Sequence, residues 1–189
     1  MTRFVDRGAI TAAYVGIGMA VTIGVSFLLV IPIEPIYWLL APLAGLMIGY
    51  YANQRSNQTR GAWRRVIVNS LFAGLLTGLT LAVLLLAVKF LFFSADDGYR
   101  DASLGGPISC TSGAGCVYQR YLDENKGAEL SAVGVTDASS FSRFYWNQQL
   151  TTAGLLFGIT TVTSLLGGAT YALTGPRAGR PTAANQPAA

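Results

Sequence analysis

The sequence predicts an all-α integral membrane protein with four transmembrane helices. Apolar residues, 52% of the chain, come in long blocks, charged residues make up only 12%, and most arginines lie in three short polar segments. A soluble domain of this size carries more surface charge, whereas blocks of about 20 apolar residues match the hydrocarbon core of a bilayer. The chain is therefore predicted to form two helical hairpins in a membrane.

The apolar blocks give the boundaries of the spans. The first block is too long for the apolar region of a secretory signal and no small-residue cleavage site follows it, so we expect an uncleaved anchor. A short turn that contains Glu34 separates it from a second block of barely sufficient length. The third block is long enough to tilt in the bilayer. The first three predicted spans are residues 9–33, 36–52 and 66–93, all within the segment 9–93, and the fourth is residues 147–174.

The positions of the arginines orient these helices. Residues 1–8, 53–65 and 175–189 together carry eight arginines and a single acid, Asp6, whereas residues 94–146 carry seven acids and four bases. Basic segments next to spans stay in the cytoplasm. Both termini are therefore predicted to be cytoplasmic, and residues 94–146 to form an extracytoplasmic loop, in the cytoplasmic membrane of a bacterium. The net charge of +4 follows from this topology and does not indicate nucleic-acid binding.

Aromatic residues gather at the predicted span ends, where amphipathic rings favour the depth of the headgroups. Any single one of them could instead be an ordinary packing residue. Trp146 is the candidate for contact with headgroups or a partner. The outer belt is predicted to comprise Tyr37, Trp38, Phe90, Phe92, Phe93, Phe144, Tyr145 and Trp146, and the inner belt Tyr50, Tyr51, Trp63 and Tyr171.

Small residues recur four positions apart in all four spans, which places them on one face of each helix. In lipid such faces let helix backbones approach closely and hold a bundle together. The fourth span has a second small face at Ser164, Gly168 and Ala172. Either the bundle uses all these faces internally, or this second face and the series in the first span contact another protein. The predicted packing glycines are Gly16, Gly24, Gly45, Gly49, Gly74, Gly78, Gly154 and Gly158.

Residues of the types used in catalysis and in binding metals or cofactors are scarce in this chain. The chain has no histidine, which removes the commonest ligand for haem, chlorophyll-type pigments and zinc. No ionisable residue lies deep in a span, since Lys89 is near the outer end of the third span and can extend its amine to the headgroups. Asn69 is predicted to form a hydrogen bond between helices. We therefore expect no enzymatic activity and no cofactor of its own, although lipid or the pigment of a neighbouring chain could lie in its grooves.

Cys110 and Cys116 are predicted to form a disulfide. Five small residues separate them, which lets the chain turn until the sulfurs meet, and the extracytoplasmic side permits disulfides to persist. In the chain-entropy model, a disulfide that closes so short a loop lowers the conformational entropy of the unfolded chain and thereby stabilises the folded state by about 2–3 kcal/mol. The alternatives are two free thiols or a metal site that lacks two of its usual four ligands.

Two further helical features are predicted around the extracytoplasmic loop. Residues 117–126 mix aromatic, aliphatic and charged side chains at helical spacing, with Gly127 as the expected stop. A group of short polar residues should then cap a last helix that starts outside the bilayer and enters it through the aromatic belt. The capping residues are Thr136, Asp137, Ser139 and Ser140.

The tail after residue 174 is rich in alanine and proline and lacks a core of its own. Arg177 and Arg180 are candidates for contact with lipid headgroups or a partner. Two arginines give only about 2 kcal/mol of attraction to anionic lipid, which favours a protein partner. The leading interpretation is a non-catalytic accessory subunit of a multi-subunit bacterial membrane complex, respiratory or photosynthetic, that contacts lipids and other subunits. The alternative is a small homo-oligomeric channel or carrier for a neutral or lipidic substrate.

Overall fold

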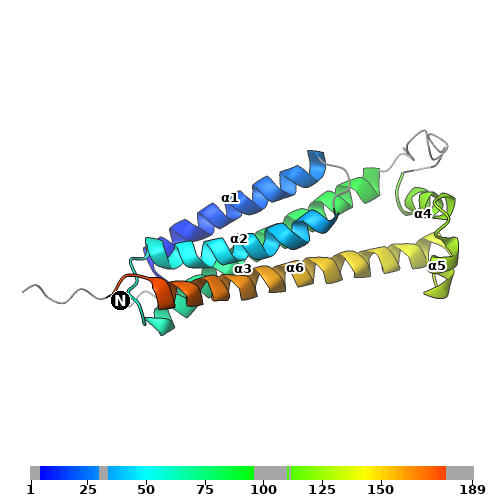
Figure 1. Ribbon diagram of the computed structural model, residues 1–189. Coiled ribbons are helices and arrows are strands. Elements are labelled where there is room, and N and C mark those ends of the chain that lie inside the picture. The colour runs from blue at the N-terminus through cyan, green and yellow to red at the C-terminus, as the bar shows by residue number, and fades with distance from the viewer. Residues whose placement is uncertain (1–4, 30–33, 96–109, 111, 178–189) are drawn as a thin grey trace, which may run out of the picture. The chain divides into compact units, whose positions relative to one another are not determined.

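The computed structural model describes residues 5–29, 34–95, 110 and 112–177, and over these residues the protein is entirely α-helical (Figure 1). Three of its helices are long and apolar enough to cross a membrane: α3, α6 and the stretch Arg7–Val25 of α1. The prediction of a helical, multi-pass membrane protein is therefore confirmed. The helices in the described part are α1 (Arg7–Leu29), α2 (Glu34–Arg55), α3 (Trp63–Ala95), α4 (Ala114–Asp123), α5 (Gly127–Ala132) and α6 (Ala138–Thr174).

The chain divides into two compact units. The first unit comprises residues 1–81 and 156–189, and the second comprises residues 82–155. In the first unit α1 and α2 lie beside the N-terminal part of α3 and the C-terminal part of α6 (Figure 1). The second unit contains the end of α3, the short helices α4 and α5, and the start of α6.

The turn between α2 and α3 follows from its residues. Arg55 ends α2, and Asn57 then adopts a left-handed conformation with φ 50°, which asparagine tolerates better than most residues. Gly61 has φ 85° shortly before α3 begins at Trp63. Pro42 lies inside α2 and removes one backbone donor from that helix.

The first unit has small residues inside and large apolar residues outside. One of its buried clusters joins Ala9, Ala12, Ile48, Ala52 and Ala73. Large apolar side chains on the outer faces are half exposed or more, among them Leu39, Met47, Leu79, Val162 and Leu166. An exposed apolar surface of this extent matches a helical bundle surrounded by lipid, where close packing of small residues replaces a hydrophobic driving force.

The second unit has a core that the sequence did not predict. Its buried residues come from α3, α4, α5, α6 and the segment before α6, and three of them are aromatic. Phe93 and Tyr145 belong to this core, with ring centroids 4.8 Å apart. For these two residues the structure therefore favours the alternative of ordinary packing residues over membership of the outer aromatic belt. The buried core residues are Phe93, Val117, Leu130, Val135, Phe141 and Tyr145.

The helix expected after Cys116 is present, but Gly127 does not end it. α4 ends at Asp123, the chain reverses through Asn125 with φ 61°, and Gly127 instead begins α5. The left-handed residue that follows the helix is therefore Asn125, and not the predicted Gly127. Close to this turn Lys126 pairs with Glu124 at 2.7 Å, and this hydrogen bond raises the pKa of Lys126 above its ordinary value.

The polar cap before α6 is confirmed. The carboxylate of Asp137 accepts hydrogen bonds from the backbone N–H groups of Ser139 and Ser140, each at 2.8 Å. The hydroxyl of Ser140 accepts from the N–H groups of Thr136 and Asp137, each at 3.1 Å. The first turn of α6 thereby gains side-chain acceptors for donors that have no partner inside the helix.

Loss of the Asp137 carboxylate should fray the start of α6. The hydrogen bonds from the N–H of Ser140 and the hydroxyl of Ser139 hold the pKa of Asp137 below its ordinary value. The stabilisation is therefore complete above the unfolded-state pKa of about 3.9 and is lost as the pH falls through the lower folded-state value. Amide hydrogen exchange at Ser139 and Ser140 should accelerate in Asp137→Ala near neutral pH. In the unsubstituted chain the protection factors of these amides, which correct for the intrinsic exchange rate at each pH, should fall only under acidic conditions. Equal protection in both proteins near neutral pH would contradict the capping role.

Candidate functional site

The start of α1 is tied to α3 and to the α2–α3 turn by a polar network. Oδ2 of Asp6, the residue before α1, accepts a hydrogen bond from Nε2 of Gln58 at 2.6 Å and one from Nδ2 of Asn69 at 3.0 Å. Oδ1 of Asn69 accepts in return from the backbone N–H of Asp6 at 3.4 Å. Asn69 was predicted to form a hydrogen bond between helices. Its partner is instead Asp6, the residue directly before α1.

The end of α6 is tied to the same turn. The hydroxyl of Tyr171 donates to the carbonyl oxygen of Gln58 at 2.8 Å. The backbone N–H of Arg60 donates to the carbonyl oxygen of Pro176 at 2.8 Å, and that of Gly61 donates to Ala172 at 3.2 Å. The start of α1, the α2–α3 turn and the end of α6 therefore meet at one end of the first unit, which Figure 1 shows near the label N.

A second polar cluster is buried between α2, α3 and α6. Nδ2 of Asn53 donates to Oγ of Ser70 at 2.8 Å and to the carbonyl oxygen of Gly49 at 2.9 Å. Oγ of Ser164 donates to the carbonyl oxygen of Ser70 at 2.7 Å. Oδ1 of Asn53 and Oγ1 of Thr160 are buried and have no hydrogen-bond partner among the described residues. These groups hold helices together, and none of them is a nucleophile paired with a base.

Four other threonine hydroxyls in α3 and α6 are bonded within their own helix. Thr77, Thr80, Thr161 and Thr163 each donate to a carbonyl oxygen one turn earlier in their own helix, at 2.8–2.9 Å. Such bonds satisfy the hydroxyl locally. Within the described residues no group of three or more His, Cys, Asp or Glu is placed to hold a metal ion.

The Asp6 network should contribute to stability. Hydrogen bonds to a charged group contribute about 1.5–3 kcal/mol, so Asp6→Ala should lower the free energy of unfolding by about 2 kcal/mol. Asp6→Asn keeps an acceptor oxygen and should lose less. Chemical unfolding in mixed micelles measures both values. A change below about 0.5 kcal/mol for Asp6→Ala would contradict the role of the network.

Four of the predicted packing glycines lie where a side chain has no room. A Cβ on Gly49 would collide with the backbone of Ser164 in α6, and one on Gly45 would collide with the carbonyl oxygen of Thr160. A Cβ on Gly74 would approach Cβ of Ser164 to 2.6 Å, and one on Gly16 would collide with the side chain of Thr77. α2 therefore approaches the backbone of α6 closely, whereas Gly74 and Gly16 leave room for the side chains of Ser164 and Thr77.

The other predicted packing glycines differ among themselves. A Cβ on Gly78 would lie 3.1 Å from the carbonyl oxygen of Phe157, which is tight, and Gly24 is buried in α1. A Cβ on Gly154 or Gly158 would meet no described atom within 4 Å. For these two glycines the predicted contact is not made by the described part of this chain.

The second small face of the fourth span packs inside the chain. A Cβ on Gly168 would collide with Oγ of Ser70, Ser164 is bonded to Ser70, and Ala172 is buried. The series in the first span is also buried, with Ala12 and Ala20 at most 1% exposed. The interpretation that these two faces contact another protein was therefore wrong, because the bundle itself covers them.

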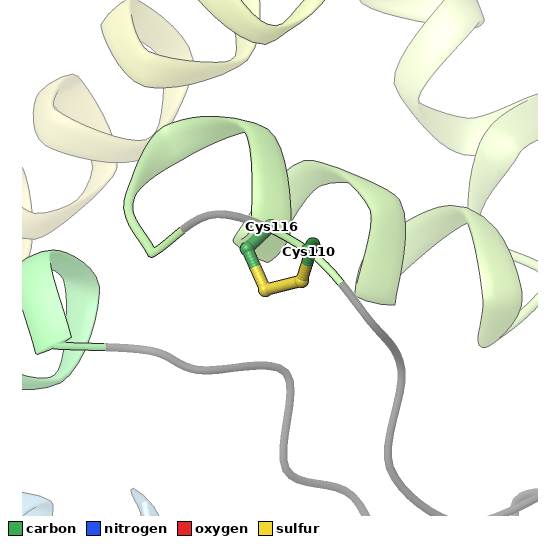
Figure 2. Close-up of a disulfide and its surroundings, with 2 residues drawn as sticks. All are labelled: Cys110 and Cys116. Carbon is green, nitrogen blue, oxygen red and sulfur yellow. A yellow bond between two sulfur atoms is a disulfide. The ribbon is translucent and has the colours of Figure 1, made fainter.

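The predicted disulfide between Cys110 and Cys116 is present, with the two Cα atoms 5.2 Å apart (Figure 2). Cys116 lies in the first turns of α4 and is 1% exposed. Cys110 lies before the helix and is half-buried. The disulfide therefore joins the segment before α4 to a buried residue of α4 in the second unit.

Reduction should expose the two sulfurs unequally. Without reductant we expect no labelling by a thiol reagent, and after reduction Cys110 should react several-fold faster because burial shields Cys116. The double variant Cys110→Ser/Cys116→Ser should lower the stability of the second unit by about 2–3 kcal/mol. Alkylation followed by peptide mass measurement gives the site-resolved rates. Labelling before reduction would contradict the disulfide, and equal rates after it would contradict the burial of Cys116.

The predicted contact residues at the two ends have different surroundings. Trp146 packs on the aromatic core, with its ring 5.4 Å from that of Phe93 and 6.1 Å from that of Phe90. Arg177 is described and exposed. Arg180 lies outside the described residues.

Sequence reasoning missed two parts of these sites. Gln58 had no recognisable signal, since a polar residue in a basic loop gives no indication of a partner far away in the sequence. The aromatic core did leave a signal, because Tyr118 and Tyr121 precede the Phe141–Tyr145 cluster and their rings lie 5.4 Å and 5.0 Å from that of Phe141.

Comparisons of the chain with known protein families, with curated proteins and with solved structures give no match.

Proposed function

We propose that this protein is a non-catalytic accessory subunit of a multi-subunit complex in a bacterial cytoplasmic membrane, with a respiratory or photosynthetic complex as host. The observation that carries the proposal is the closed interior of the first unit. At Gly45 and Gly49 the backbone of α2 approaches that of α6 too closely for even a methyl group. A bundle closed in this way supports packing against neighbours better than passage of a substrate through a single copy.

The proposal includes a fourth span, α2, and places both termini in the cytoplasm. Hydrogen bonds join Asp6, before α1, to Asn69 near the start of α3, and join Gln58 to Tyr171 near the end of α6. Ends that meet on one side require an even number of crossings. In this proposal α2 is the fourth membrane crossing, and its exposed side chains include the apolar Leu39, Leu43 and Met47. The arginines at the end where the helices meet favour the cytoplasmic side for that end.

Sided labelling tests this topology. An epitope tag at each terminus should be accessible in inverted membrane vesicles and protected in intact spheroplasts, while the loop disulfide should be reducible from outside the cell. Tags on opposite sides of the membrane would contradict four spans. Both tags outside would contradict the orientation.

A strip on the outer face of α6 is the proposed contact with a neighbouring subunit. Gly158, Val162 and Leu166 follow one another at intervals of four residues, Val162 and Leu166 are more than half exposed, and no described atom lies near a Cβ built on Gly158. Glycine between large apolar residues leaves a shallow notch that a partner helix can approach closely.

Photocrosslinking in native membranes tests this contact. A photoreactive amino acid at Val162 should give a discrete adduct with a different polypeptide, and Gly158→Leu should abolish that adduct without unfolding the chain. The exposed Leu79 of α3 is the matched position and should give lipid adducts. Adducts of Val162 with lipid alone, or with a second copy of this chain, would contradict the proposed contact.

The runner-up remains a homo-oligomeric channel or carrier for a neutral or lipidic substrate, with a path between copies. Flux of such a substrate into liposomes that contain this chain alone would establish it. The accessory-subunit proposal expects the same liposomes to be no more permeable than protein-free ones.

A further inference from the structure

One end of the first unit carries a concentration of exposed arginines. All six lie at helix ends or in the turn that joins α2 to α3, and every one is exposed. We call this surface the arginine end. It consists of Arg7, Arg55, Arg60, Arg64, Arg65 and Arg177.

Backbone contacts fix these residues close to one another. The N–H of Arg60 bonds to the carbonyl oxygen of Pro176, the residue before Arg177, at 2.8 Å. A Cβ on Gly8 would collide with the backbone of Arg55, so Arg7 lies beside the end of α2. Arg64 and Arg65 occupy the first turn of α3, which contains no acidic residue.

The positive charge of this end is not neutralised by the described part of the chain. Asp6 is the acidic residue described there, and its Oδ2 already accepts hydrogen bonds from Gln58 and Asn69. No ion pair joins a described arginine of this end to a described carboxylate. Six positive charges therefore face solvent or lipid with one negative charge among them.

The surroundings of the arginine end are those expected at the depth of phospholipid headgroups. Exposed apolar side chains begin directly after it on α3, at Ile67 and Val68, and the exposed rings of Tyr50 and Trp63 flank it. Aromatic rings favour the interface, and an arginine there rests its stem on apolar surface while its guanidinium reaches the phosphates. The planar guanidinium matches a phosphate with two parallel hydrogen bonds.

We propose that the arginine end binds the headgroups of anionic phospholipids. The α2–α3 turn is held at both sides, by Tyr171 at the carbonyl of Gln58 and by Ala172 at the N–H of Gly61. Its arginines are therefore presented on a fixed backbone, unlike those of a flexible basic segment. Orientation in advance of binding reduces the ordering cost and favours lipids that carry a net negative charge over zwitterionic ones.

Lipid retention by the purified full chain tests this proposal. The chain in neutral detergent is titrated with phosphatidylglycerol or with phosphatidylcholine of the same acyl chains, and bound lipid is counted by native mass measurement. We expect phosphatidylglycerol to be retained about fivefold better or more, with a preference that falls as salt is raised. Equal retention of the two lipids would overturn the proposal.

Substitutions localise the effect. Arg64→Gln/Arg65→Gln should remove most of the preference, whereas Arg64→Lys/Arg65→Lys should keep part of it because the charge remains without the bidentate geometry. Arg143→Gln, at an exposed arginine of the second unit, is the matched control and should change nothing. Arg55→Gln/Arg177→Gln provides a second pair if the first proves unstable. An undiminished preference in both glutamine pairs, or displacement of the lipid by inorganic phosphate, would overturn the assignment.

Discussion

Gly49→Leu should prevent the first unit from folding. The Cβ of any side chain at this position would collide with the backbone of Ser164, which cannot move away as the tip of a flexible side chain can. Overpacking in a filled core costs about 1–3 kcal/mol, and a backbone collision between two helices belongs at or above the top of that range. Even Gly49→Ala should destabilise. Thermal unfolding in detergent and the yield of monodisperse protein measure the effect.

Gly158→Ala and Gly158→Leu are the matched controls for Gly49. A Cβ at Gly158 would meet no described atom within 4 Å, so neither substitution should destabilise the isolated chain. Alanine should even gain up to about 1 kcal/mol in helix propensity. Equal stability of the Gly49 and Gly158 variants would contradict the backbone contact between α2 and α6.

Phe141→Ala should have the second large effect and should unfold the aromatic core. Phe141 is fully buried, with its ring 5.0 Å from that of Tyr121 and 6.1 Å from that of Tyr145. Removing a buried phenylalanine side chain costs about 3–5 kcal/mol, because apolar contact is lost and a cavity remains. Near-ultraviolet circular dichroism should lose the part of the aromatic signal that comes from the second unit, and Cys116 should become as reactive as Cys110 after reduction.

Phe92→Ala is the control for that substitution. Phe92 lies in the same unit but is 51% exposed, so its truncation should leave the aromatic signal and the reactivity of Cys116 nearly unchanged. If both variants behaved alike, Phe141 would not be the centre of a packed core.

The features that the sequence predicts correctly are those set locally. Three spans follow from length and hydropathy, the Cys110–Cys116 disulfide follows from a short flexible spacing, and the cap of α6 follows from the chemistry of Asp137. Each of these depends on residues within a few turns of one another, where spacing alone fixes the geometry.

The features that the sequence predicts wrongly depend on distant neighbours. The small-residue period marks a face of α6, but it does not say which helix covers that face, and Ser70 covers Gly168 while Gly158 remains open. Likewise, aromatic residues at a span end suit both a lipid interface and a core. Phe93 and Tyr145 are buried because residues of α4, α5 and the segment before α6, namely Val117, Leu130 and Val135, join them in one core.

The native mass of the complex extracted from its own membrane in mild detergent is the most direct test of the accessory-subunit proposal. We expect this chain to leave the membrane in a species of defined mass that contains at least one different polypeptide. Recovery only as a monomer or as a homo-oligomer would contradict the proposal.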